Sequence, residues 1–253
     1  MENGIKNQSI YKAFQVLECF TKEKVELSIQ ELSMDTGLYK SNVFNILSTL
    51  KSLGYVHQNA DNHKYYLSSK FAVLASNSDA GSNLWKRIPE TLQKIAQATG
   101  EVAFFAIRGG DEIKYLNSAY PNGREPSSAL NMTGMSAPMY CTSLGKVILA
   151  WQDRENVLAY LSREELVPFT DNTITDHDAF LTELETVRQQ GYAIDNMEHE
   201  YGIVCLAVPV FVEPGKLLGA ISVSGPSLRF SISNITRILD VLRKHVLDME
   251  AQA

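Results

Sequence analysis

The chain has 253 residues, and 45% of them are hydrophobic, so it is long enough for two domains and for a sizeable buried core. Its three cysteines, Cys19, Cys141 and Cys205, are far apart and odd in number, which excludes a disulfide framework and a Cys-x-x-Cys metal motif and fits a reducing cytosol. We find no secretory leader and no run of about 20 apolar residues, so we expect a cytoplasmic protein that has no membrane partner.

Charge is distributed unevenly along the chain, whose formal net charge is −6. Residues 1–68 carry seven lysines against seven acidic residues, whereas the remainder carries 16 basic against 22 acidic residues. A uniformly basic coat for nucleic acid is therefore excluded. If the chain binds DNA, a few placed lysines in an electrically neutral module must do it.

The first part of the chain shows the pattern of a winged helix-turn-helix. Apolar periodicity and turn residues predict three helices and two strands, at residues 9–20, from residue 28, and at residues 39–53, 55–58 and 64–67. Ser9 is the expected cap of the first helix, and Ser28 with Glu31 forms a capping box for the second. Three short helices followed by a hairpin are typical of the winged form of this motif.

The third predicted helix carries the residue types that read DNA. Short polar side chains can reach base edges in the major groove, and lysines can reach the flanking phosphates. The candidate DNA contacts are Lys40, Ser41, Asn42, Phe44, Asn45, Ser48 and Lys51 on this helix and Lys64 in the hairpin. The alternative is a solvated polar face on a small helical bundle, and the order of the five elements favours DNA.

A stretch rich in serine and asparagine separates this module from the rest of the chain. We assign residues 1–68 to a DNA-binding domain, 69–83 to a linker with a short helix at 70–75, and 84–253 to a second domain. In the second domain we predict helices at residues 84–98 (kinked or restarted at Pro89), 147–151, 154–161, 177–190 and 231–249, strands at 102–107, 113–119 and 128–132, and a loop at 135–138.

A predicted hairpin between Gly191 and Pro226 combines apolar strands with polar groups. A turn at Pro214–Gly215 pairs positions whose numbers sum to 429, which places Cys205 opposite Ser224 and Ala207 opposite Ser222. Asp195 arrives from the acidic loop before, and Pro209 predicts a bulge or an exposed edge. These groups either line a small site or bond to backbone in an ordinary buried hairpin.

A second candidate feature is the segment from Cys141 to Lys146, which opens a helix. Backbone N–H groups at such a start favour an anion such as a carboxylate. The longer phosphate-loop motif is absent, and Ser143 with Lys146 lacks the partner motifs of a hydrolase. We interpret Glu198-His199-Glu200 as a solvated loop and expect neither a metal nor a cofactor.

With these residues in view, the chain resembles the IclR family of bacterial transcriptional regulators over nearly its whole length. The matching segments are SIYKAFQVLECF, LYKSNVFNILSTLKSLGYV, HKYYLSSKF, PMYCTSLGKVILAW, GYAIDNMEHEYGIVCLAVPVF and ISVSGPSLRFS. The resemblance implies an α+β chain of two domains: an N-terminal winged helix-turn-helix, a linker helix, and a C-terminal GAF-like antiparallel sheet with helices on both sides. It also implies a homodimer or homotetramer on a palindromic operator in double-stranded DNA.

The resemblance further implies an effector site, and within the family the chain looks most similar to repressors of sugar-acid catabolism of the 2-keto-3-deoxygluconate type. The family's contacts fall on the backbone at Ser143 and Leu144 and on the side chains of Asp195, Cys205, Ser222 and Ser224. A small 2-oxo acid or sugar acid suits these groups.

Two segments depart from the pattern of these relatives. Residues 41–45 read Ser-Asn-Val-Phe-Asn where relatives often have Ser-Thr-Val-His-Arg, which should change the operator that is read. Met132, Met135 and Ser136 stand where the sugar-acid repressors have arginines, so we expect a ligand with fewer charges or in another orientation.

The leading hypothesis is a DNA-binding regulator, most simply a repressor of a carbohydrate-acid operon, whose operator affinity changes when a small carboxylated metabolite binds the second domain. It is not an enzyme. The alternative is a GAF-like thiol enzyme, or a redox-sensing regulator, that uses Cys205 or Cys141.

Overall fold

The computed structural model describes residues 6–21, 24–76, 82–121 and 132–252. The chain divides into two compact units, Met1–Asp79 and Ala80–Ala253. Within the described residues, no helix is both long and apolar enough to span a bilayer. The predicted strand at residues 128–132 falls almost entirely outside the described residues.

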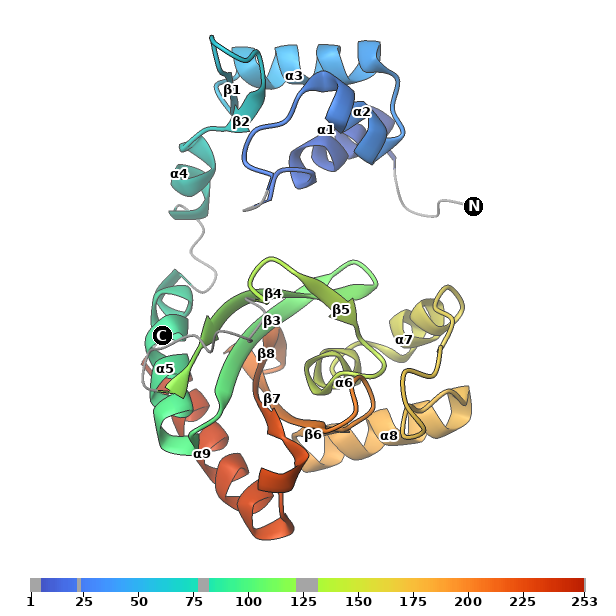
Figure 1. The fold of residues 1–253 in the computed structure, drawn as a ribbon, viewed down its shortest axis with the longest axis vertical. Helices are drawn as coiled ribbons and strands as arrows, with labels where there is room; N and C mark the ends of the chain where they lie inside the picture. The colour runs from blue at the N-terminus through green and yellow to red at the C-terminus, as the bar shows by residue number, and fades with distance from the viewer. Residues whose placement is uncertain (1–5, 22–23, 77–81, 122–131, 253) are drawn as a thin grey trace. The chain divides into compact units, whose positions relative to one another are not determined.

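The first unit contains the three helices and the hairpin expected from the sequence (Figure 1). Its elements are α1 (Gln8–Glu18), α2 (Ile29–Thr36), α3 (Lys40–Ser52), β1 (Val56–Gln58), β2 (Tyr65–Leu67) and α4 (Lys70–Ser76). Side chains from these elements and the loop before α2 form one buried cluster: Val16, Leu27, Leu32, Val43, Leu47, Leu50, Val56 and Tyr65.

Local chemistry explains the ends of these helices. The capping box is present, because the Ser28 side chain accepts from the Glu31 N–H while the Glu31 carboxylate accepts from the Ser28 N–H. Gly37 then turns the chain with a left-handed φ of 69°, which only glycine adopts without strain. The prediction of Ser9 as the first cap is wrong: Asn7 caps α1, and its side chain accepts from the Ser9 and Ile10 N–H groups.

The second unit is a six-stranded antiparallel sheet with helices on both faces, and the strand order is β5-β4-β3-β8-β7-β6. The strands are β3 (Val102–Gly109), β4 (Glu112–Ala119), β5 (Ser136–Pro138), β6 (Ala193–Asn196), β7 (Ile203–Glu213) and β8 (Lys216–Pro226). The helices are α5 (Ser82–Thr99), α6 (Ser143–Ala150), α7 (Arg154–Leu161), α8 (His177–Gln190) and α9 (Ile232–Glu250), with a short 3₁₀ helix, η2, at Ser227–Arg229.

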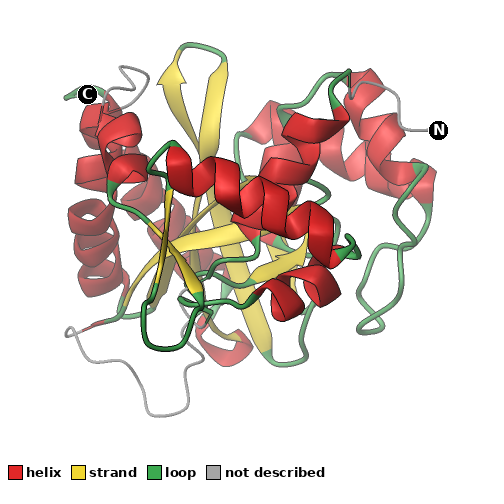
Figure 2. Cartoon of the chain, turned by 90° about the horizontal axis from the view of Figure 1, so that it is seen from above, coloured by secondary structure: helices red, strands yellow, loops and turns green. Residues whose placement is uncertain are grey.

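The sheet is curved, and its two faces are covered by different helices (Figures 1 and 2). Helix α6 packs inside the concave face together with α8, and α5 and α9 cover the convex face. Alternation along β7 divides its side chains between two cores: Val204, Leu206 and Val208 belong to the convex core, and Ala207 belongs to the concave one.

Four predictions about this unit need correction. Residues 136–138 form a strand because they pair with β4, where a loop was predicted. Helix α5 continues through Pro89 as one helix, so the restart predicted there as an alternative to a kink is wrong. Helix α6 begins at Ser143, four residues earlier than predicted. Asp195 lies in strand β6 and pairs with Cys205, whereas an acidic loop was expected there.

The predicted register of the long hairpin is confirmed. Cys205 pairs with Ser224 and Ala207 pairs with Ser222, so the sum rule holds through this part of the ladder. Strand β6 pairs with β7 only between Val204 and Ala207, and Pro209 therefore lies beyond that ladder. A proline is tolerated there because the β6–β7 ladder ends before it, so no hydrogen bond to β6 is lost through the missing N–H group.

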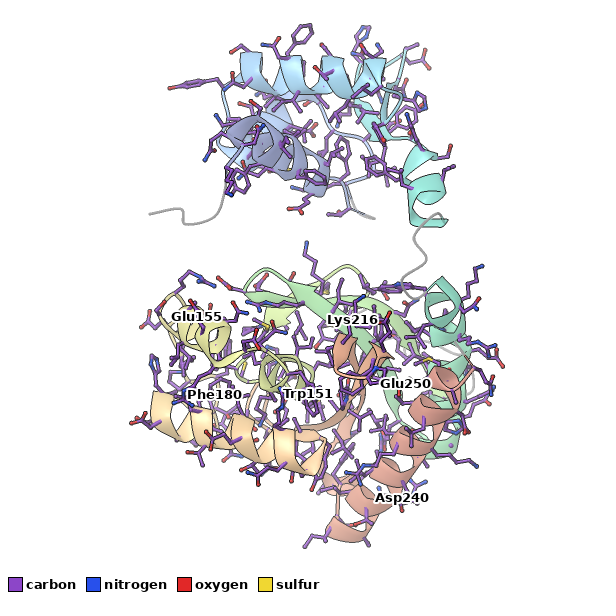
Figure 3. The ribbon with its side chains drawn as sticks, turned by 180° about the vertical axis from the view of Figure 1, so that it is seen from behind. Trp151, Glu155, Phe180, Lys216, Asp240 and Glu250 are labelled. Carbon is purple, nitrogen blue, oxygen red and sulfur yellow. The ribbon has the colours of Figure 1, made fainter. Side chains whose placement is uncertain are left out.

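The tip of this hairpin is held from two sides (Figure 3). The Phe211 N–H donates to Glu250 Oε1 on α9 over 2.7 Å, which anchors β7 to the last helix. The Phe211 ring meets the Trp151 ring at the end of α6 edge to face, with 5.8 Å between the centroids. Near their tip, the two long strands are thereby fixed against both layers of helices.

Candidate functional site

One row across the sheet collects three of the predicted effector residues. Asp195 on β6 pairs with Cys205 on β7, and Cys205 pairs with Ser224 on β8. The Cys205 thiol donates to Ser224 Oγ over 3.1 Å. Paired residues share one face of a sheet, so a carboxyl, a thiol and a hydroxyl stand side by side on the concave face.

The next row on the same face is small and apolar apart from one hydroxyl. It runs from Ala193 through Ala207 to Ser222, and Ser222 is 2% exposed. Ala193 and Ala207 pack in the same cluster as Leu144 of α6. Helix α6 therefore approaches the sheet at these two alanines, which brings Ser143 and Leu144 to the side of the sheet that carries the polar row.

The start of α6 has the donor arrangement expected of an anion site. Thr142 caps the helix, and its Oγ1 accepts from the Gly145 N–H. The Lys146 N–H makes the first intrahelical bond, to the Thr142 carbonyl, so of the three N–H groups before it those of Ser143 and Leu144 remain outside both the cap and the helix. A Cβ on Gly145 would lie 2.2 Å from the Met139 carbonyl oxygen, so only glycine allows this close approach of α6.

Asp195 is a buried carboxyl group with an unusual proton affinity. It is 3% exposed, and burial raises its pKa from 3.8 to about 7, although hydrogen bonds from the Glu198 and His199 N–H groups and the charge of Lys146 act in the opposite direction. The Glu198 N–H donates to Asp195 Oδ1 over 2.7 Å. Near neutral pH this group can present either a carboxylate or a hydroxyl donor to a bound molecule.

The interpretation of Glu198 as part of a solvated loop is wrong. Glu198 is 5% exposed, and Lys146, which is 1% exposed, donates to Glu198 Oε1 over 2.7 Å and to Glu183 Oε1 over 2.9 Å. Burial raises the pKa of Glu198, and the ammonium group of Lys146 lowers it. The described residues contain no cluster of ligands that could hold a metal ion.

The thiol groups of Cys141 and Cys205 are poorly suited to nucleophilic or redox reactions. Burial raises the pKa of both Cys141 and Cys205, and the Asp195 carboxylate raises both further. Since the thiolate is the reactive form, neither sulfur is activated for nucleophilic attack or for rapid oxidation at neutral pH. The electrostatics of the site therefore count against the thiol enzyme and against the redox sensor.

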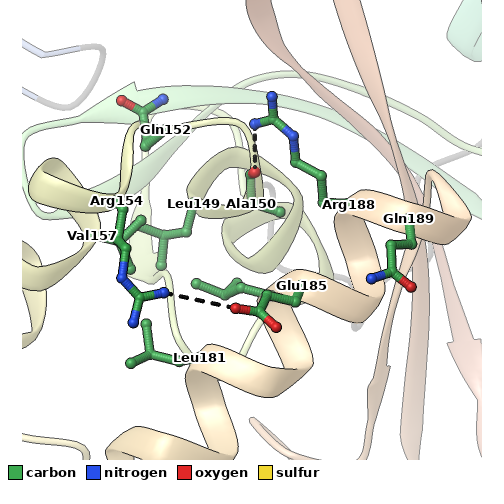
Figure 4. Close-up of a pocket in the computed structure, with 10 residues that line it drawn as sticks. Leu149, Ala150, Gln152, Arg154, Val157, Leu181, Glu185, Arg188 and Gln189 are labelled. Atoms are coloured by element: carbon green, nitrogen blue, oxygen red, sulfur yellow. Dashed lines mark hydrogen bonds and ion pairs between the residues drawn. The ribbon is translucent and has the colours of Figure 1, made fainter.

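The second unit has two cavities, and none of the six predicted effector residues lines either of them. One, of about 270 Å³, is bounded by α6, α7 and α8; there Arg154 pairs with Glu185 at 3.7 Å and Arg188 donates to the Ala150 carbonyl (Figure 4). The other, of about 620 Å³, follows the outer side of β6 and includes Ile194, Asn196 and Glu198.

In the first unit, α3 presents the predicted DNA-binding residues to solvent. Lys40, Ser41, Phe44, Asn45 and Lys51 are exposed, and Asn42 and Ser48 are partly exposed. Their lysines are lightly held: the Lys51 ammonium donates to Gln58 Oε1 over 2.9 Å, and that of Lys40 to Gln30 Oε1 over 3.4 Å.

Lys64 differs from the other candidates because its charge is already paired. Its ammonium group lies 3.1 Å from Glu31 Oε1, the carboxylate of the capping box. Hydrogen bonds from Ser28, followed by that of Lys64, lower the pKa of Glu31 to about 2. Tyr39, which is not among the predicted contacts, precedes α3 without a side-chain cap bond and is 82% exposed.

A winged helix-turn-helix with an exposed polar third helix, joined to a second unit with a buried polar row, defines a DNA-binding transcription factor with a ligand-binding domain. The model of the IclR helix-turn-helix domain matches residues 9–60, and that of the bacterial transcriptional regulator IclR C-terminal domain matches residues 80–251. The chain belongs to the IclR family of transcriptional regulators.

Similar proteins support the same assignment over almost the full length. The HTH-type transcriptional regulator KdgR of Escherichia coli is 33% identical over 96% of this chain and 92% of its own. KdgR of Dickeya chrysanthemi is 35% identical over 89% of this chain and 73% of its own. The crystal structure of an IclR transcriptional regulator from Alicyclobacillus acidocaldarius is 25% identical, with a TM-score of 0.76 over 97% of this chain and 98% of that one. The predicted two-domain α+β fold class is confirmed, and these relatives are regulators rather than enzymes.

Proposed function

We propose that this chain is a cytoplasmic repressor of a carbohydrate-acid catabolic operon. As a homodimer or homotetramer it binds a palindromic operator, and a small 2-oxo acid or sugar acid lowers its affinity for that operator. The effect requires a ligand that binds the DNA-competent and DNA-incompetent arrangements with different affinities.

The observation that carries the ligand proposal is the row Asp195, Cys205 and Ser224 beside the start of α6. The Ser143 and Leu144 N–H groups suit a carboxylate. The carboxyl group of Asp195 and the hydroxyls of Ser222 and Ser224 suit the hydroxyl groups of a sugar acid. A 2-oxo acid with a hydroxylated tail matches both ends.

Residues 132–136 bear on the size and charge of this ligand. Met132 is partly buried against the concave core, Met135 is 42% exposed, and Ser136 begins β5. No guanidinium group stands at these three positions, so ligand charge beyond the single carboxylate has no partner there. We therefore choose two probes with one carboxylate each: pyruvate, which lacks hydroxyl groups, and 2-keto-3-deoxygluconate, which has them.

The DNA proposal assigns separate roles to the lysines and the amides of α3. Lys40 and Lys51 reach phosphates, so their contribution is independent of sequence and sensitive to salt. Asn42 and Asn45 read base edges, with Ser41, Phe44 and Ser48 beside them. Lys64 contacts DNA only if it exchanges Glu31 for a phosphate, so we assign it the smallest share.

The test measures operator binding by fluorescence anisotropy with DNA from upstream of the chain's own gene, with and without each probe. We expect release of the DNA by 2-keto-3-deoxygluconate in the wild type. Asp195→Ala and Ser222→Ala should abolish this response and leave operator binding unchanged. Asp240→Ala and Ser233→Ala, at exposed positions of α9, are the matched controls. If the ligand still released the DNA fully from both site variants, the effector site would have to lie elsewhere. DNA binding that does not depend on salt would refute the proposal that the chain is a DNA-binding regulator.

A further inference from the structure

Lys146 is a buried residue of α6, and its side chain forms no hydrogen bond with any of the six proposed effector residues. Its side chain is 1% exposed, and its ammonium group lies 2.7 Å from Glu198 Oε1 and 2.9 Å from Glu183 Oε1. A charge at this depth persists only when it is paired and hydrogen-bonded, because desolvation otherwise favours the neutral form. The two carboxylates thus stabilise the buried ammonium group of Lys146, and the ammonium group in turn fixes the positions of the two carboxylates.

Glu198 belongs to the turn that directly follows β6, the strand that carries Asp195. Its backbone N–H donates to Asp195 Oδ1 over 2.7 Å, and its own Oε1 accepts from the Asn196 N–H over 3.4 Å. Met197 between them has a φ of 58°, a left-handed conformation that methionine rarely adopts. Thr173 Oγ1 donates to the Glu198 carbonyl over 2.6 Å. Contacts from outside the hairpin therefore maintain a turn that its own sequence does not favour.

A single helix links the two ends of the proposed ligand site. Helix α6 begins with Ser143 and Leu144, whose N–H groups suit the carboxylate of a ligand, and Lys146 follows within its first turn. Through Lys146 the same helix fixes Glu198, and through Glu198 it fixes Asp195. The β6–β7 ladder fixes the Asp195 backbone, and the buried Lys146–Glu198 pair adds a link from α6 to the Asp195 carboxyl group.

We propose that Lys146 is a positioning residue of the effector site, which holds Glu198 so that Asp195 faces the hydroxyl groups of the ligand. This inference rests on the proposed function and deepens it, because it assigns discrimination between sugar acids and shorter 2-oxo acids to a residue that touches no ligand. A purely structural lysine would instead affect the binding of both classes equally.

The experiment uses the full chain and two measurements. Hydrogen exchange followed by mass spectrometry reports on residues 193–202 without any ligand, and calorimetry gives the affinities for pyruvate and 2-keto-3-deoxygluconate. The variants are Lys146→Met, which removes the charge, Lys146→Arg, which keeps it, and Glu198→Gln, which keeps the shape of the side chain. Lys94→Met, which removes the exposed pair with Glu90 on α5, is the control.

We expect Lys146→Met and Glu198→Gln to accelerate exchange at residues 193–202. Their affinity for 2-keto-3-deoxygluconate should fall roughly tenfold to hundredfold, the range for loss of one hydrogen bond to a charged group, while the affinity for pyruvate stays within about twofold. Lys146→Arg should retain most of the discrimination, and Lys94→Met should match the wild type.

Two results would overturn the inference. Unchanged exchange in Lys146→Met would show that the ion pair does not hold the turn, and an equal loss of affinity for both probes would show a general structural role. A wild-type chain that binds neither probe would refute the sugar-acid proposal instead. The exchange data would then decide on Lys146 alone: faster exchange supports its hold on the turn, and unchanged exchange overturns it.

Discussion

Replacing Asp195 by asparagine should make the second unit more stable, and the gain should grow with pH. Burial raises the pKa of Asp195 from 3.8 to about 7, so the folded state binds this proton more tightly than the unfolded state does. Stability contributed by a protonated group of this kind is present at low pH and is lost as pH rises from the unfolded pKa to the folded one. Above pH 7 the wild type bears the whole cost of a buried carboxylate.

The size of the effect follows from the shift. About three pKa units at 1.36 kcal/mol each give about 4 kcal/mol in full, of which about 3 kcal/mol develops between pH 5 and pH 8. Asparagine cannot ionise, and its Oδ1 can still accept from the Glu198 N–H, so the substitution removes the charge and keeps this bond. Relative to the wild type, the variant should gain that amount of unfolding free energy over this interval.

Urea unfolding at pH 5 and pH 8 measures this difference. The chain has two tryptophans, Trp85 and Trp151, and both lie in the second unit, so their emission reports on this unit within the full chain. Asp240→Asn, on an exposed face of α9, is the control and should show no such trend. An equal stability difference at both pH values would refute the buried-carboxylate reasoning.

Three further outcomes test other parts of the structure. Gly145→Ala should destabilise the second unit by about 3 kcal/mol in urea, because the new Cβ meets the Met139 backbone; normal stability would contradict the close approach of α6. In DNA titrations, Lys51→Ala should weaken binding to all DNA sequences alike and reduce the slope of log affinity against log salt concentration by about one. Asn45→Ala should instead reduce the free-energy difference between operator and other DNA by about 1–3 kcal/mol. Identical results for the two variants would contradict the separate roles assigned to lysines and amides. In the native chain, Cys141 and Cys205 should react with Ellman's reagent at least roughly tenfold more slowly than in urea, since burial raises their pKa, and equal rates would restore the redox hypothesis.

Local rules predicted much of this fold from the sequence. The Ser28–Glu31 capping box depends on neighbouring residues alone, and it is present. The Cys205–Ser224 register follows from a turn and a two-residue period, and it is confirmed. The Asn7 cap was missed because Ser9, two residues later, has the same chemistry, and geometry alone chooses between them.

The errors concern interactions between residues far apart in the chain. From sequence, Glu198 has the pattern of an exposed acidic loop. In the structure it is paired with Lys146, which lies 52 positions earlier and cannot be recognised as its partner from the neighbouring residues. The strand at residues 136–138 is too short for a periodic signal and is defined by its pairing with β4. The positions of the effector residues remain a prediction, although the structure brings Asp195, Cys205 and Ser224 into one row on the concave face.

The alternation of β7 and β8 between two cores limits how this domain can change its ligand during evolution. Inserting or deleting one residue within the regular ladder at residues 203–210, without a bulge to absorb it, would send the aliphatic side chains of the convex core to the concave face, and the polar row to the other side. Such a change destroys both layers at once. With the proposed effector site on this row, new ligand preferences arise by replacing side chains at fixed positions, or in the loops that approach the row, while the hairpin keeps its length.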